Sequence, residues 1–179
     1  MTIKPFIVRV FIKEKFMAEV KLKGSPIHTN GSLPPKGQKA PPIQGVGVEL
    51  KELSLADFKG KKKIICFVPS LDTSVCSTSA KKFSDAVKKK PNVAVIYLSA
   101  DTPFAMKRTC MELDAITPLS LVRSKKTAED YGVLFKDGPL AGFCARAVVV
   151  LDENDHVVYT QLVDEVTHEP DYEKALLHV

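Results

Sequence analysis

The segment "KKIICFVPSLDTSVCSTSAKKFSDAVKKK", residues 62–90, decides the fold because its hydrophobic pattern changes once along its length. Its beginning, KKIICFV, ends in an apolar run rich in β-branched side chains, which is typical of a buried strand. Further on, Ala80, Phe83 and Val87 recur at spacings of three and four, which indicates one face of a helix. The polar residues in between do not continue a strand easily. They predict an exit from the strand into the helix, with Cys76 in the first helical turn.

The alternation of strand-like and helix-like segments continues outward from this point. Downstream, the pattern predicts further elements in the order strand, helix, short strand, helix, hairpin and closing helix, over residues 92–100, 102–114, 116–122, 124–132, 144–165 and 169–179. Upstream, it predicts a hairpin with a Gly-Ser-Pro turn, a proline-rich lead-in, a strand and a short helical turn, over residues 19–30, 31–45, 46–50 and 53–60. This order predicts an α/β, thioredoxin-like fold with a mixed central sheet flanked by helices and an N-terminal β-hairpin.

Composition limits the class of protein. The 179 residues suffice for one domain with a sizeable core. Residues 1–16 carry scattered charges and lack the apolar core of a secretory signal, so we expect a disordered extension or residues upstream of the true start. Residues 17–179 are then the folded domain. No segment approaches the ~20 apolar residues of a membrane span, so we expect no membrane partner. Because no secretory signal is visible, we expect a cytoplasmic location.

Charge and ligand residues exclude further classes. The net charge of +5 comes from lysines in short bursts without interleaved aromatic residues, which does not favour nucleic-acid binding. Four cysteines without a C-x-x-C motif are too few for a disulfide scaffold. The four histidines are scattered, so we expect neither a metal nor another cofactor.

Cys76 stands where a thiol is activated. The unpaired N–H groups and the dipole at a helix N-terminus favour a negative charge there, and the thiolate is the nucleophilic form of cysteine. Thr73, three residues earlier, is placed to cap the helix and to turn its hydroxyl towards the sulfur. Position alone leaves an inert cysteine as an open alternative.

The spacing of Pro69, Thr73 and Cys76 gives P-x-x-x-T-x-x-C, which resembles the active-site signature of the peroxiredoxins. The longer run FVPSLDTSVC is similar to that of the thiol peroxidase subfamily, the atypical two-cysteine kind. SADTPFAMKRTC resembles the subfamily's resolving-cysteine helix, and YGVLFKDGPLAGFCARAVVVLDENDHVVYTQLVDEVTHEPDYEKAL resembles its C-terminal third. The similarity extends from Val20 to Leu177.

The resemblance implies a role for each matching residue. Cys76 matches the peroxidatic cysteine, and Cys110 matches the resolving cysteine. Thr73 matches the hydroxyl that bonds the thiolate and the peroxide, while Pro69 matches the residue that shields the pocket from water. Arg146 matches the guanidinium beside the thiolate, and its planar set of donors suits the charge that develops as the O–O bond breaks.

The resemblance also implies the reaction and its partners. Hydrogen peroxide or an organic hydroperoxide would oxidise Cys76 to a sulfenic acid, which Cys110 would capture as an intramolecular disulfide before further oxidation. Thioredoxin would reduce this disulfide, in a homodimer that serves antioxidant defence. Because the two cysteines lie in separate predicted helices, we expect local unfolding during turnover.

The other two cysteines have different expectations. Cys66 lies inside an apolar run, which favours core packing. Cys144 precedes Arg146 by two residues, so strand alternation would place both on one face, near the active site. Cys144 is then either a bystander or an off-path partner for oxidised Cys76.

Two other functions remain open from the sequence. The first is a redox-sensing or chaperone-like protein, in which the Cys76–Cys110 bond is a signal and peroxide removal is incidental. The second is a thioredoxin-fold binding module with inert cysteines.

Overall fold

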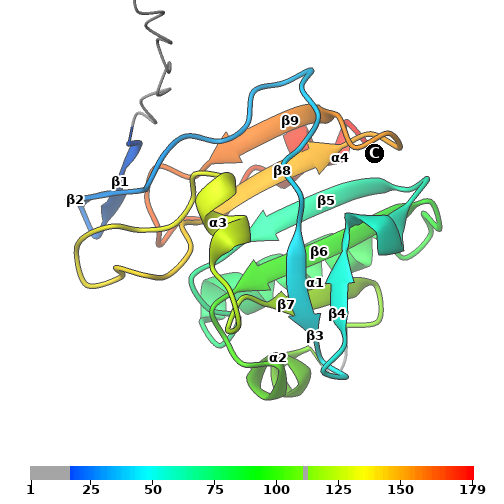
Figure 1. The fold of residues 1–179 in the computed structure, drawn as a ribbon, viewed down its shortest axis with the longest axis horizontal. Helices are drawn as coiled ribbons and strands as arrows, with labels where there is room; N and C mark the ends of the chain where they lie inside the picture. The colour runs from blue at the N-terminus through cyan, green and yellow to red at the C-terminus, as the bar shows by residue number, and fades with distance from the viewer. Residues whose placement is uncertain (1–16, 111–112) are drawn as a thin grey trace, which may run out of the picture.

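The computed structural model describes residues 17–110 and 113–179. The predicted N-terminal extension, residues 1–16, lies outside the described residues. In the described part, seven strands form one sheet in the order β4-β3-β7-β6-β5-β8-β9, and two more form a separate hairpin, β1-β2 (Figure 1). The strands are β1 (Glu19–Leu22), β2 (Ser25–His28), β3 (Gln44–Gly47), β4 (Glu52–Ser54), β5 (Lys62–Phe67), β6 (Val93–Ser99), β7 (Ile116–Ser120), β8 (Ala147–Leu151) and β9 (Val157–Leu162). The helices are η1 (Leu55–Phe58), α1 (Ser74–Val87), α2 (Pro103–Thr109), α3 (Lys126–Asp130) and α4 (Tyr172–Leu176).

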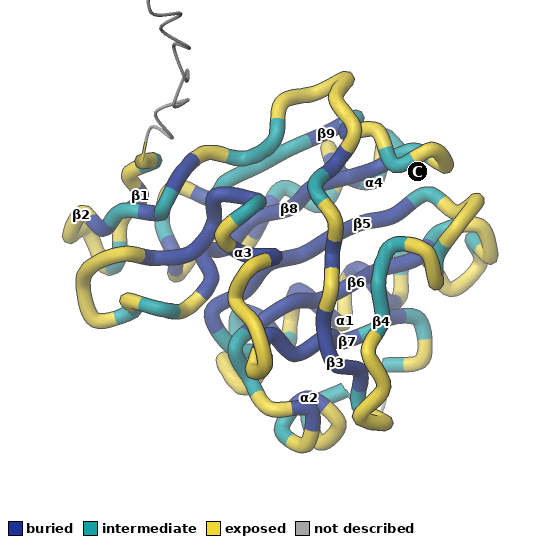
Figure 2. The backbone as a smooth tube through the Cα atoms, in the orientation of Figure 1, coloured by how far each residue is buried: buried dark blue, intermediate teal, exposed yellow. Residues whose placement is uncertain are grey.

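Strand directions confirm the predicted mixed sheet. β5 pairs with β6 in parallel, and β6 pairs with β7 in parallel. β8 runs antiparallel to β5 and to β9, while β3 runs antiparallel to β7 and to β4. The strands β5 and β6 are buried along nearly their whole length (Figure 2). This burial on both faces explains why their sequences are continuous apolar runs rather than alternating ones.

Two hydrophobic clusters fill the two faces of the sheet. One contains Ile64 and Cys66 of β5 together with the apolar face of α1, and α4 packs on the same side. The other contains Ile65 and Phe67 of β5, with α3, the proline-rich lead-in and the hairpin. Figure 1 shows α1 and α4 behind the sheet and α3 in front of it. The period-two alternation of β5 therefore divides the core between the two faces.

Several predicted boundaries were wrong in detail. The hairpin turns at Lys23 and Gly24, whose φ angles are 51° and 83°, rather than through Gly-Ser-Pro. Such a two-residue turn with positive φ at both positions matches the twist of the flanking strands. Pro26 lies in β2, where an edge position tolerates the missing N–H. In the last predicted hairpin, over residues 144–165, the first strand begins at Ala147, three residues later than expected.

Among the described residues, none of the helices combines the length and the apolar character needed to cross a membrane.

Gly132, two residues after the end of α3, provides a test of how the proline-rich lead-in packs. Its φ is +71°, and an added Cβ would lie 2.3 Å from the carbonyl oxygen of Ser32 and 2.6 Å from its nitrogen. Gly60 has a similar φ of +76° but open space around it. We expect Gly60→Ala to cost about 1 kcal/mol, from backbone strain alone, and Gly132→Ala about 3 kcal/mol, because the Ser32 backbone must also move. Urea unfolding of both variants measures this difference, and equal losses would contradict the close packing.

Candidate active site

Cys76 lies in the first turn of α1, as the sequence predicted. β5 ends at Phe67, the chain passes the buried Pro69, and the helix begins at Ser74. Thr73 has the extended backbone of an N-cap residue, with φ −87° and ψ 145°. The Cys76 side chain is fully buried, with 0% of the residue exposed, so its sulfur is shielded from bulk water.

The Thr73 hydroxyl donates to the sulfur of Cys76, at an Oγ1–Sγ distance of 2.9 Å. The same hydroxyl lies 3.1 Å from the carbonyl oxygen of Ser70. A hydroxyl has one proton, so it serves one of these two acceptors at a time. The side chain forms no capping hydrogen bond with the helix. The predicted turn towards the sulfur is therefore confirmed, whereas the predicted side-chain cap was wrong.

Arg146 supplies the second donor to Cys76. Its Nη1 atom lies 3.3 Å from Sγ, although the two residues are 70 positions apart. Its Nε and Nη2 atoms both donate to the Val166 carbonyl, at 3.1 and 2.9 Å. Only 3% of Arg146 is exposed. A planar guanidinium bound along one edge in this way directs its remaining nitrogen at a fixed point, which here is the sulfur.

Arg146 forms no ion pair with a carboxylate in the described part of the chain. Arg146 has only a small effect on Glu169. The hydrogen bond with Lys82 is the largest cause that lowers the pKa of Glu169, and the charge of Arg146 is the smallest. A buried cation without a counter-ion is costly. The Cys76 sulfur is the side-chain atom that the remaining nitrogen of Arg146 faces, at 3.3 Å.

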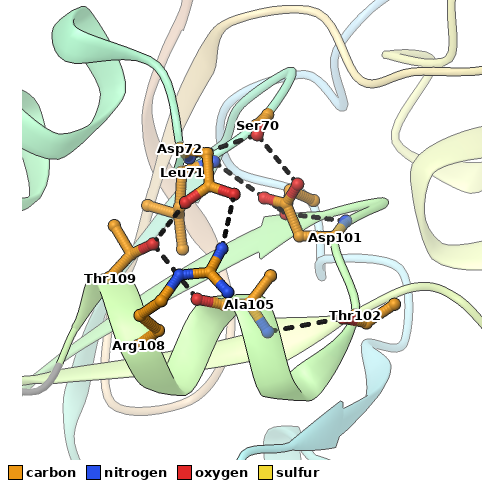
Figure 3. A network of polar contacts seen from close by, with 9 residues as sticks. Ser70, Leu71, Asp72, Asp101, Thr102, Ala105, Arg108 and Thr109 are labelled. Carbon is orange, nitrogen blue, oxygen red and sulfur yellow. Dashed lines mark hydrogen bonds and ion pairs between the residues drawn. The ribbon is translucent and has the colours of Figure 1, made fainter.

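A network of carboxylates holds the loop that leads into α1 (Figure 3). Asp101 accepts hydrogen bonds from the hydroxyl of Ser70 at 2.8 Å and from the N–H of Leu71 at 2.7 Å. It also accepts one from the Ser99 hydroxyl at 2.7 Å. Because β5 and β6 are parallel, their carboxyl ends meet at one edge of the sheet. A carboxylate following β6 is therefore placed to bind the loop that follows β5.

Asp72 extends this network to the helix that carries Cys110. Its carboxylate accepts a hydrogen bond from the Thr109 hydroxyl at 2.7 Å and pairs with Arg108 at 3.2 Å. Both partners belong to the last turn of α2. The reasoning from sequence missed Asp72 and Asp101, because it did not predict which strands lie side by side in the sheet.

Cys110 follows α2 as its C-cap residue. It is half-buried and packs against the same hydrophobic cluster as Cys76. Burial, followed by the charge of Asp101, raises the pKa of the Cys110 thiol to about 11. Both cysteines are free thiols in this structure. Cys110 is therefore a neutral thiol at physiological pH, on the same side of the sheet as Cys76.

The structure also places the other two cysteines. Cys66 is buried in β5, and burial raises the pKa of its thiol to about 12, so core packing is confirmed. The expectation that Cys144 shares a face with Arg146 was wrong. Residues 144–146 precede β8 and are not part of a strand, so alternation does not apply, and Cys144 packs in the cluster on the opposite face of the sheet from Cys76. Burial raises the pKa of Cys144 to about 12.

Within residues 17–110 and 113–179, no three His, Cys, Asp or Glu side chains lie together in a way that could hold a metal ion.

Comparisons with known proteins identify the family. The Redoxin family model matches residues 35–176. A thiol peroxidase of Corynebacterium glutamicum is 43% identical over 89% of this chain and 98% of its own length. A thiol peroxidase of Leptospira interrogans is 42% identical over 89% of this chain and 96% of its own length.

Solved structures give the same result. A peroxiredoxin-like protein from Aquifex aeolicus has a TM-score of 0.84 and 39% identity, covering 90% of this chain and 95% of that one. The thiol peroxidase from Chromobacterium violaceum, at 22% identity, shares the fold with a TM-score of 0.81 over 87% of this chain and 91% of its own. The fold and its thiol at a helix N-terminus define a thioredoxin-like redox protein. The chain belongs to the redoxin family and, within it, to the peroxiredoxin-type thiol peroxidases.

Asp101 offers a test of the network around the active-site loop. Asp101→Asn removes the charge that strengthens three hydrogen bonds and places a donor among donors, so we expect a loss of about 2 kcal/mol in unfolding free energy. It should also lower the pKa of Cys110, because Asp101 contributes to raising it. Urea unfolding and the pH profile of Cys110 alkylation in a Cys76→Ser background measure these effects. The exposed Asp114→Asn is the matched control, and equal behaviour of the two variants would contradict the role of Asp101.

Proposed function

We propose that this peroxidase reduces hydroperoxides through the thiolate of Cys76, resolves the product through Cys110 within the same chain, and is recycled by thioredoxin. The observation that carries the proposal is the buried Arg146 guanidinium, 3.3 Å from the Cys76 sulfur and without a carboxylate partner among the described residues. The Thr73 hydroxyl, at 2.9 Å, supplies a second donor to the same sulfur.

In the first step, the Cys76 thiolate attacks one peroxide oxygen. An S–O bond forms, the O–O bond breaks, and the leaving oxygen takes up a proton to become water or an alcohol. Arg146 and Thr73 are placed to donate to the oxygens as negative charge develops on them, and such fixed donors stabilise a transition state. Pro69, which is buried beside the loop, would keep water away from the sulfur.

In the second step, Cys110 loses its proton, its sulfur attacks the sulfenic sulfur of Cys76, and water leaves as the disulfide forms. This capture protects Cys76 from irreversible oxidation. Cys76 lies inside a helical turn. The loop before it is bound to α2 through Asp72 and to Asp101, which precedes α2. The two segments must therefore rearrange locally for the sulfurs to meet. A thioredoxin dithiol would then take over the disulfide by exchange.

The biological setting belongs to the same proposal. The relatives are named thiol peroxidases, which supports hydrogen peroxide and organic hydroperoxides as substrates. Recycling by thioredoxin requires a reducing compartment, which favours a cytoplasmic location and a role in antioxidant defence. A homodimer follows from the resemblance to the subfamily.

Cysteine variants test the reaction sequence. Peroxide consumption coupled to thioredoxin should be lost in Cys76→Ser, because the nucleophile is gone. Cys110→Ser should complete one turnover and then stop, because nothing resolves the sulfenic acid. Cys144→Ser is the control and should keep full activity. Activity in Cys76→Ser would refute the proposal, while slow stoichiometric turnover of the unmodified protein would favour the redox-sensing alternative.

An Arg146 variant tests the carrying observation directly. Arg146→Met removes the charge and all donors, so we expect the rate constant of Cys76 with peroxide to fall by a factor of about 10²–10³. The thiolate absorbance at pH 7, measured in a Cys110→Ser background, should fall as well. Burial raises the pKa of Cys66 and Cys144 to about 12, so any thiolate at pH 7 belongs to Cys76.

Arg123→Met provides the matched control for this experiment. It removes an exposed guanidinium that pairs with Glu52, and it should change neither readout. If both variants retained peroxide reactivity, the role assigned to Arg146 would be wrong.

A further inference from the structure

The Val166 carbonyl, which binds two nitrogens of Arg146, belongs to a segment that pairs with the N-terminal hairpin. The Val166 N–H donates to the carbonyl of Lys21 at 2.8 Å, and the Lys21 N–H donates to the carbonyl of Asp164 at 2.7 Å. These bonds make a parallel bridge between Lys21 and Glu165. The segment after β9 is thereby paired with β1, beside which it runs in Figure 1. This pairing fixes the peptide planes on either side of Glu165. The Val166 carbonyl lies in the next plane, together with the N–H of Thr167, which donates to the Glu165 carboxylate.

The Glu165 carboxylate closes the pairing by binding the turn of the hairpin. Its Oε1 accepts the N–H of Lys23 and its Oε2 the N–H of Gly24, both at 3.0 Å. Oε1 also accepts the N–H of Thr167 at 3.1 Å and its hydroxyl at 2.9 Å. These bonds, first the one from Gly24, lower the pKa of Glu165 to about 2. The left-handed φ of both turn residues presents two successive N–H groups to one carboxylate.

The hairpin is anchored firmly enough to act as a support. Val20 and Ile27, which face each other across the two strands, are each only 3% exposed and belong to the hydrophobic cluster in front of the sheet. The Thr29 N–H donates to the carbonyl of Ala18 at 2.9 Å, and the Asn30 N–H to the carbonyl of Leu134 at 2.8 Å. A displacement of Val166 away from Arg146 would therefore have to strain the hairpin or break its bonds.

We propose that Glu165 is a positioning residue for the peroxidase reaction, which clamps the hairpin so that the Val166 carbonyl aims Arg146 at Cys76. This inference rests on the proposed function. Because Nε and Nη2 share one carbonyl acceptor, the position of that oxygen sets the direction of Nη1. A misplacement of a reacting group by about 1 Å can cost as much as 10²-fold in rate. The hairpin thus becomes part of the support of the active site, although none of its side chains contributes to the bonds made with Cys76 in this structure.

Glu165→Gln tests the clamp, because it keeps the shape of the side chain but replaces one oxygen by an NH₂ group that faces N–H donors. In a Cys110→Ser background, we expect the rate constant of Cys76 with peroxide to fall about tenfold, in keeping with a partial misplacement. The pH profile of the thiolate absorbance should move to higher pH. Amide hydrogen exchange at Lys21 and Val166 should become faster, which reports the loosened hairpin directly.

Asp164→Asn is the matched control. This variant removes the same charge one residue earlier in the chain. The Asp164 carboxylate makes no hydrogen bond within the described residues, so the substitution breaks none. The backbone carbonyl of residue 164 keeps its bond with the Lys21 N–H. All three readouts should stay at their unmodified values. A shift in both variants would assign the effect to net charge and would overturn the proposal.

The other possible outcomes also decide whether Glu165 positions Arg146. Faster exchange in Glu165→Gln with unchanged Cys76 chemistry would show that the hairpin is structural only, and unchanged exchange would show that Glu165 is not the clamp. Glu165→Asp, which keeps the charge but shortens the reach, should fall between the parent and Glu165→Gln, and it serves if Glu165→Gln does not fold. Thiolate absorbance needs no turnover, so the clamp remains testable even if Cys76→Ser retained peroxidase activity and refuted the proposed function.

Discussion

The arrangement of this site depends on one interaction, the buried guanidinium of Arg146 between the Val166 carbonyl and the Cys76 sulfur. A cation removed from water needs a negative partner, and a backbone carbonyl offers only a partial charge. The sulfur completes the pairing when it is ionised. In the proposed reaction, the same contact would also provide a donor for the oxygen that leaves. Ground state and transition state would then depend on one side chain, which the fold must hold rigidly.

The sheet provides that rigidity at its carboxyl edge. β5 and β6 are parallel, so the loop that precedes Cys76 and the start of α2 leave the sheet at the same edge, where Asp101 binds the loop. β8 lies antiparallel on the other side of β5, so its beginning, next to Arg146, reaches the same edge. Residues 70 positions apart therefore meet because of strand direction and strand order, and the chemistry of the site is a consequence of the topology.

Much of the fold and of the site was predictable from the residue pattern, and the predictions that failed did so for physical reasons. The run KKIICFV and the spacing of Ala80, Phe83 and Val87 correctly indicated a buried strand and a helix, because burial dictates those residues directly. Cys144 was misplaced because alternation was applied to residues that are not in a strand. The Val166 carbonyl was beyond prediction, since a backbone acceptor leaves no trace in residue type. Asp101 could be inferred only once the order of the strands was known.

The proposed mechanism would place two opposing demands on the loop before α1. Attack on peroxide needs Cys76 aligned with Arg146 and Thr73, whereas resolution needs the same residue to leave its helical turn. The bonds from Asp72 to α2 and from Asp101 to the loop lie on the side of α2, and the support of Arg146 lies on the side of the hairpin. Because these anchors are separate, the proposed resolution step would release the loop towards Cys110 while Arg146 stays in place. The site can then re-form around an intact guanidinium after each reduction, which would keep the cost of the rearrangement local.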